Sequence, residues 1–434
     1  MRLSSSILLV ASILVVLLLH LPVATRAHSQ DGGGEEGSWE PVSFTRDLER
    51  ERRRIELHQV GSCWEHEVTP CLKQCSERRR LMSERFNSSL LYGRMHSIDT
   101  LALQMFEMDL EVCGSYCQAD VAWHCSQDNY AQGGTHTFKF GGRWPFHRWW
   151  MYAEPLSAIF SMLSVIMHLW SFVTYRQARR NFATQFHAWQ RAKLLTQTAD
   201  ADAATAAAGA PDSSSSSPSS SPSQHGELEP INVDEWYPFD GLRVLHLGVW
   251  MSAYLFSYSF HTVDIRLTEY LDYYGAVIAS SFAVYTSIVR TLSLRVPARA
   301  SASSLALVLA APFVGYVLFH CHSLYRSFDY KFHNIACIAL MTTQAVVWLS
   351  WCAIQLFAGR NQRAAWYMIK GQVCMIFFAS FEIWDFPPVW GVLDAHACYH
   401  LFANVVFYLW THYEVSDMEY RFRTYVSENE NKLK

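Results

Sequence analysis

Repeated apolar runs between residues 149 and 412 constrain this chain more than any other feature. Several are long enough to cross a bilayer, which takes about 20 apolar residues per helix. Hydrophobic residues make up 50% of the chain and charged residues only 17%, below the roughly 25% that is usual in soluble domains. We read the runs as helices and therefore expect an all-α membrane protein.

Seven transmembrane helices are predicted, and the basic residues support their orientation. Arg and Lys gather in alternate connections, which indicates that those connections face the cytosol. An odd number of spans then places the N-terminal segment in the lumen and the tail, residues 413–434, in the cytosol. The predicted spans are approximately 151–175, 241–261, 271–292, 303–322, 333–357, 366–384 and 395–412.

The ends and one internal loop have the composition of non-spanning segments. Residues 1–27 read as a signal peptide, with Arg2 before an apolar core and small residues before a cut after Ala27; the alternative is an uncleaved anchor helix. Residues 28–148 are polar and form the expected lumenal domain. Residues 198–235 are rich in Ala, Ser and Pro, so we expect a disordered cytosolic loop. The net charge of -4 gives no basic field for nucleic acid.

Six of the 11 cysteines lie in the lumenal domain with mirror-image spacing. Cysteines four apart share one face of a helix, so two antiparallel helices can be joined by nested disulfides. An oxidising compartment favours disulfides over the alternative, a zinc site. A glycosylation sequon at Asn87 is consistent with lumenal exposure. The predicted pairs are Cys63–Cys125, Cys71–Cys117 and Cys75–Cys113.

Three sets of ionisable residues stand at the lumenal ends of predicted spans, where polar groups by default indicate function. Ser257 and His261 are four apart at the end of the second span, on one helix face. Asp272 opens the third span. Asp394, His396 and His400 open the seventh, and the two histidines have the H-x-x-x-H spacing that lets two imidazoles reach one metal. All three sets lie at one depth.

Convergence of these helices would place three histidines and an aspartate together. Three histidines with an open fourth position are how proteins hold a catalytic zinc. Each residue alone has an ordinary alternative: His261 as an interfacial hydrogen bonder, Asp272 as a partner of Arg266. Glu154 either caps a helix or contacts one of the metal-ligating histidines. The remaining candidates to orient the histidines are Asp264, Glu269, Glu382 and Asp385.

Four stretches closely resemble the family of post-GPI-attachment lipid-remodelling factors, from about Cys63 to the last span. They are FGGRWPF (140–146), EPLSAIFS (154–161), FHTVDIRLTEYLDYYGA (260–276) and DFPPVWGVLDAHACYH (385–400). That family belongs to a superfamily of seven-span hydrolases with the alkaline ceramidases and the adiponectin and progestin receptors. Its pattern of Ser-x-x-x-His, a later Asp and a C-terminal His-x-x-x-His falls on Ser257, His261, Asp272, His396 and His400.

The resemblance implies Zn2+ on His261, His396 and His400, with Asp272 as acid and base and Ser257 near the bound water. It implies an acyl hydrolase of the endoplasmic reticulum or Golgi membrane. The substrate would be the sn-2 acyl ester in the phosphatidylinositol part of GPI-anchored proteins, reached among membrane lipids. A ceramidase-like amidase is the alternative enzyme. A receptor or chaperone for GPI-anchored proteins is the alternative without catalysis.

Overall fold

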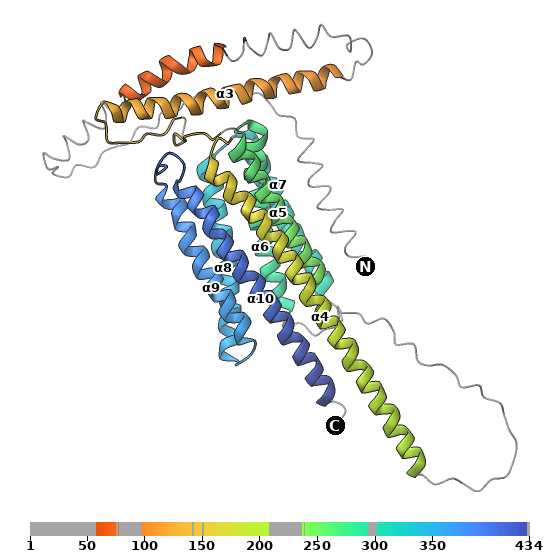
Figure 1. Ribbon diagram of the computed structural model, residues 1–434. Helices are drawn as coiled ribbons and strands as arrows, with labels where there is room; N and C mark the ends of the chain where they lie inside the picture. Colours follow the sequence, from red (N-terminus) through yellow and green to blue (C-terminus); the bar gives the residue numbers. More distant parts are fainter. Residues whose placement is uncertain are drawn as a thin grey trace.

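The structure is a computed structural model in which helices account for the regular elements, with three isolated β-bridges among the described residues. Helices α4 to α10 lie side by side as a bundle, and α3 (Ile98–Ala131) lies across one end of it (Figure 1). We call this end the α3 end. The predicted signal peptide, residues 1–27, and the sequon at Asn87 lie outside the described residues, which are 58–74, 77, 98–140, 143–149, 152–207, 237, 239–293 and 302–431.

A helix occupies each range that was predicted to span the membrane. Among the described residues, five of these helices are long and apolar enough to cross a bilayer: α4, α6, α7, α8 and α9. An all-helical membrane fold is therefore supported, while the figure of seven spans stays a prediction. The helices are α4 (Pro155–Ala207), α5 (Asp240–Thr262), α6 (Arg266–Ser293), α7 (Ala302–Arg326), α8 (Tyr330–Phe357), α9 (Gln362–Trp384) and α10 (Ala395–Asn431).

Helices α5 and α10 fall short of the hydropathy expected of a span for a physical reason. They carry all three of the predicted ligand histidines, together with buried Ser257 and Asn404. Each of these polar side chains lowers the mean hydropathy of its helix, yet it faces the bundle interior rather than its outer surface. The low hydropathy therefore reflects what the two helices hold inside the bundle.

Two of the three predicted disulfides are present. Cys63–Cys125 and Cys71–Cys117 join the helix over residues 58–74 to α3, with Cα atoms 5.8 and 5.7 Å apart. The nested pairing follows the mirror spacing of the cysteines. Because these four cysteines form disulfides, they do not form the zinc site that was the alternative. Cys75 of the third predicted pair, Cys75–Cys113, lies outside the described residues, so this pair stays a prediction.

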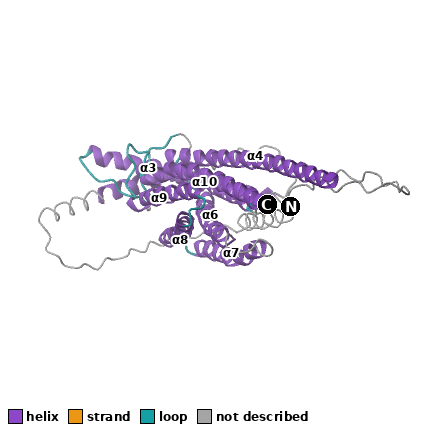
Figure 2. Ribbon diagram, turned by 90° about the horizontal axis from the view of Figure 1, so that it is seen from below, coloured by secondary structure: helices purple, strands orange, loops and turns teal. Residues whose placement is uncertain are grey.

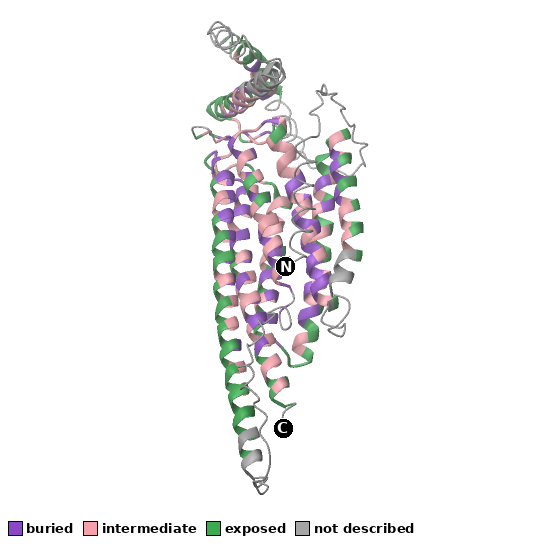
Figure 3. Ribbon diagram, turned by 90° about the vertical axis from the view of Figure 1, so that its right-hand side faces the viewer, coloured by how far each residue is buried: buried purple, intermediate pink, exposed green. Residues whose placement is uncertain are grey.

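Helix α4 is longer than the sequence indicated. Its predicted span ended at 175 and a disordered loop was expected from 198, but the helix continues to Ala207. The run 196–207 is rich in Ala, a strong helix former. This helix propensity is enough to continue α4, although the run has no apolar face with helical periodicity. Seen from below, α4 reaches beyond its neighbours (Figure 2), and its distal part is mostly exposed (Figure 3). Residues 208–236 lie outside the described residues.

Packing through α4 brings the functional ends of the helices together. α4 packs against both α5 and α10, α6 packs against α5, and α9 packs against α10. Because consecutive helices run antiparallel, the start of α4, the end of α5 and the start of α10 meet at the α3 end (Figure 1). Gly275 of α6 allows a close approach, since a Cβ there would lie 3.2 Å from Cα of Ala253 on α5.

We predict that Gly275→Val lowers the apparent melting temperature in detergent, because the added side chain forces α5 and α6 apart. Overpacking of this kind costs about 1–3 kcal/mol. Gly248→Val on α5 is the matched control, since a Cβ at Gly248 meets no atom within 4 Å. Equal melting temperatures for the two variants would show that the helices are not in close contact at Gly275.

Candidate metal centre

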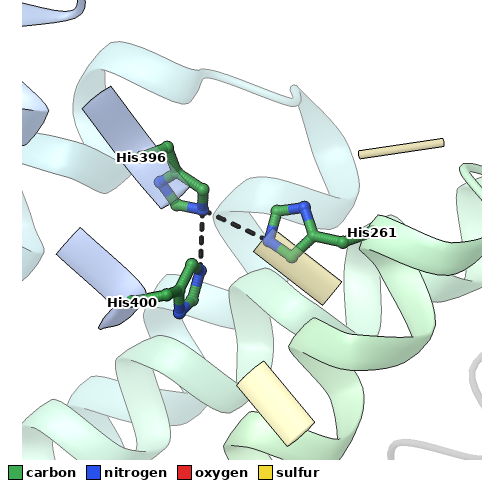
Figure 4. Close-up of side chains that lie close together, drawn as sticks. All are labelled: His261, His396 and His400. Carbon is green, nitrogen blue, oxygen red and sulfur yellow. Dashed lines mark hydrogen bonds between the residues drawn. The ribbon is translucent and has the colours of Figure 1, made fainter. Parts of the chain in front are cut away.

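Three histidines from two helices converge at the α3 end of the bundle. His261 lies in the last turn of α5, and His396 and His400 lie in the first two turns of α10. The Nε2 atom of His396 is 3.2 Å from Nε2 of His261 and 2.9 Å from Nε2 of His400. Figure 4 shows the three rings turned toward one centre. The potential ligand atoms all lie within 4.8 Å of one another.

Carboxylates hold the outer nitrogens of two of these rings. Glu154, directly before α4, accepts from Nδ1 of His261 at 2.7 Å, and Glu382 near the end of α9 accepts from Nδ1 of His396 at 2.6 Å. A carboxylate can only accept, so each Nδ1 carries a proton, and in the neutral form of each ring Nε2 then presents a lone pair to the centre. This is the arrangement of metal-binding histidines, whose outer nitrogen commonly faces a carboxylate.

The chemistry of the donor set fits a small cation. Without a metal, the inward nitrogens can share protons in N–H···N hydrogen bonds at these distances, whereas a cation between them would allow all three to present lone pairs. Nδ1 of His400 lies 3.4 Å from the hydroxyl oxygen of buried Ser161, a neutral contact that does not add charge. Three neutral imidazoles with a free side facing a cavity are a donor set typical of zinc.

Asp272 and Ser257 lie beside the histidines. Ser257 is one turn before His261 on α5, and its hydroxyl lies close enough to interact with the carboxylate of Asp272 on α6. The hydroxyl of Ser161 donates to Ser257 at 3.4 Å. The structure therefore brings all five of the predicted site residues to one place, as the common depth of their helix ends indicated.

All five residues line one large cavity of about 1970 Å³, well above the roughly 300–1,000 Å³ of sites for small ligands. Its walls come mainly from α5, α6, α8, α9 and α10, and it reaches Trp250, Leu349 and Met375 away from the α3 end. Apolar Ile376 and Ile383 of α9 line it and are 56% and 71% exposed. The cavity is therefore open toward the outer surface of the bundle on this side.

The other predicted acidic residues have separate tasks. Asp394 caps α10 by accepting from the backbone N–H of Ala397 at 2.8 Å, which fixes the start of the helix that carries two of the histidines. Asp264 and Glu269 pair with Arg143, and Asp385 pairs with Lys139. Of the four candidates to orient a histidine, only Glu382 makes that contact among the interactions described.

The sequence alone did not single out Ser161 or Arg143. Ser161 lies on a buried face of α4 with Ser157 and Ser164, where serines at helical spacing are typical of close helix packing. The weak signal that was available is the position of both residues within the stretches FGGRWPF and EPLSAIFS. Their contacts depend on how α4 packs against α5 and α10, which local spacing does not reveal.

Comparisons with known proteins agree with this geometry. The chain is 28% identical to a GPI-specific phospholipase A2-like PGAP3 of Homo sapiens over 75% of its length and 82% of the relative. It is 27% identical to the Danio rerio protein of that name, over 71% and 79% of the two chains. It is 24% identical to post-GPI attachment to proteins factor 3 of Drosophila melanogaster, over 67% and 69%. No solved structure matches the chain.

The family comparison covers the whole helical bundle except the last part of α10. The model of the Per1-like family matches residues 103–418, a range that contains the three histidines, Ser257, Asp272 and both of the carboxylates behind the histidines. By this match over most of its length, the chain belongs to the Per1-like family.

Proposed function

We propose that this protein remodels GPI anchors by hydrolysing the sn-2 acyl ester of their phosphatidylinositol part, leaving a lyso-GPI. The observation that carries the proposal is a set of hydrolytic groups, three histidines with Asp272 and Ser257, on the wall of a cavity large enough for a lipid. Relatives over most of the chain are named GPI-specific phospholipase A2-like, which supports the choice of substrate.

His261, His396 and His400 would hold Zn2+, and their donor set fits that ion. When bound, zinc lowers the pKa of a water, so that a nucleophile able to attack an ester forms near neutral pH. Glu154 and Glu382 keep the lone pairs of His261 and His396 directed inward and increase the basicity of these rings. The carboxylates also balance the charge of the centre, which lies at the edge of an apolar bundle.

Asp272 would move the proton of the reaction. Its carboxylate takes a proton from the attacking water as the new carbon–oxygen bond forms, and returns it to the glycerol oxygen as the ester bond breaks. The products are a free fatty acid and a lyso-lipid with a hydroxyl at the former ester. The Ser257 hydroxyl would turn away from Asp272 and donate a hydrogen bond to the oxyanion; a donor of this kind is worth about 100- to 1,000-fold in other hydrolases.

The proposed membrane arrangement suits this substrate. Seven spans would place the α3 end in the lumen of the endoplasmic reticulum or Golgi, where the glycan and protein of a GPI-anchored protein project. The histidines would then lie near the level of the acyl ester, just below the lipid headgroup. The apolar wall below them, toward Trp250 and Leu349, would receive the acyl chain.

Asp272→Asn is expected to reduce kcat for fatty-acid release from a purified GPI lipid by about 100- to 10,000-fold, the usual contribution of a general acid–base group. Zinc content should be retained, because Asp272 is not a ligand. The measurement is mass spectrometry of released fatty acid. Asp329→Asn is the matched control: Asp329 caps α8 through its side chain, and asparagine keeps that capping ability. Normal turnover by Asp272→Asn would remove this residue from the mechanism.

His396→Ala is expected to lose bound zinc and all detectable hydrolysis, because only two ligands remain. The wild-type protein should lose activity with a strong chelator and regain it with added zinc. Elemental analysis of the purified protein gives the metal content, and His322→Ala, at an exposed position on α7, is the control. Ceramide as the hydrolysed lipid would indicate the amidase alternative. Binding of GPI-anchored proteins with no release of fatty acid from either lipid would indicate a receptor or chaperone.

A further inference from the structure

The segment between the disulfide-linked helices and α4, residues 139–154, crosses the α3 end of the bundle. We call it the strap; its residues 141, 142, 150 and 151 lie outside the described part. Lys139, Arg143, Trp144 and Phe146 of the strap line the same cavity as the histidines. The strap is therefore part of the cavity wall, although it belongs to no helix of the bundle.

On one side, the strap is attached to the end of α5. The Arg143 guanidinium pairs with Asp264 in the turn after α5 and with Glu269 of α6, the latter at 2.7 Å. It also lies over the ring of Phe260, 5.3 Å from the ring centre. Two backbone hydrogen bonds also join the strap to α5. The N–H of Ala153 donates to the carbonyl of Thr262 at 3.1 Å, and the N–H of Glu154 donates to the carbonyl of His261 at 2.9 Å.

On the other side, the strap is attached to the connection between α9 and α10. Lys139 pairs with Asp385, and the indole N–H of Trp144 donates to the same carboxylate at 2.8 Å. The backbone N–H of His147 donates to the carbonyl of Gly391 at 2.7 Å. Gly391 has φ +73° and lies under Trp123 of α3, where a Cβ would be 2.3 Å from the indole. The strap thus bridges the two chain segments that carry the histidines.

Charge decides what Arg143 does in this wall. A lone cation facing a cavity would be a candidate for the phosphate of a lipid headgroup. Arg143 instead meets two carboxylates, those of Asp264 and Glu269, and Glu154 lies near enough to interact with it electrostatically. Arg143 with these carboxylates carries a net negative charge, which would repel the phosphate of a lipid. Its geometry suits holding the end of α5 against the strap.

We propose that Arg143 is a positioning residue that fixes the end of α5, and with it His261, relative to His396 and His400. It acts through Asp264, Glu269 and Phe260, the last directly before His261 in the chain. The disulfide-linked helices serve as the support of the strap, because the ring centre of Trp123 on α3 lies 5.4 Å from the ring centre of His147 in the strap. The zinc-affinity and activity measurements in the test rest on the proposed function, whereas the hydrogen-exchange measurement does not.

The first measurement is hydrogen exchange of the peptide that contains Ala153 and Glu154, in detergent. Arg143→Ala should raise the exchange rate of these two amides by about three- to tenfold, because a partly exposed ion pair contributes little more than that. Arg143→Lys should restore part of the protection. Arg179→Ala is the matched control, since Arg179 pairs with Asp240 at the opposite end of the bundle. Unchanged exchange in Arg143→Ala would overturn the proposal.

The second measurement separates positioning from substrate binding. Arg143→Ala should weaken zinc binding and lower kcat by about 10- to 100-fold each, as loss of a supporting contact commonly does, with KM nearly unchanged. A raised KM with normal kcat and normal zinc affinity would assign Arg143 to substrate and overturn the proposal. Should Arg143→Ala fail to fold, Asp264→Asn and Glu269→Gln test the same contact from its other side. Should the wild-type protein bind no zinc or release no fatty acid, the hydrogen-exchange measurement still decides.

Discussion

The convergence of three imidazoles on one point is the constraint on which the rest of this structure depends. Three imidazole rings with nitrogens 2.9 and 3.2 Å apart need support, because each ring must give up water to lie in this cluster. Glu154 and Glu382 supply that support from outside, one from the start of α4 and one from the end of α9. Four helix ends therefore have to meet within a few ångströms for the centre to exist.

Polar groups at the opposite end of the bundle help to keep these helices in register. Arg243 of α5 pairs with Glu414 of α10, and Arg290 of α6 pairs with buried Asp417 of α10. Asn361, directly before α9, donates to Asp417 at 2.8 Å. Buried charges of this kind contribute little net stability, but a helix that slid by one turn would leave them unpaired. The position of α10 along its axis, and hence that of His396 and His400, is therefore fixed by contacts at both ends of the bundle.

Much of this arrangement could be predicted from the sequence, because apolar runs and cysteine spacing are local signals. They indicated every helix of the bundle and the nesting of Cys63–Cys125 and Cys71–Cys117. The meeting of His261 with His396 and His400 followed from their common depth. The roles of Ser161 and Arg143 did not, because each depends on how distant segments pack together. For Glu154 the sequence left open a helix cap or a contact of a ligand, and the structure shows its contact with His261. The extension of α4 to Ala207 was missed because the Ala-rich run was read as a loop by its composition.

The central claim is that His261, His396 and His400 together bind one zinc ion. X-ray absorption at the zinc edge of the purified protein tests it most directly. The account predicts one zinc per chain with three imidazole nitrogens at about 2.0–2.1 Å and the remaining position filled by oxygen. A spectrum dominated by sulfur ligands, or a protein that purifies in active form without a stoichiometric metal, would contradict it.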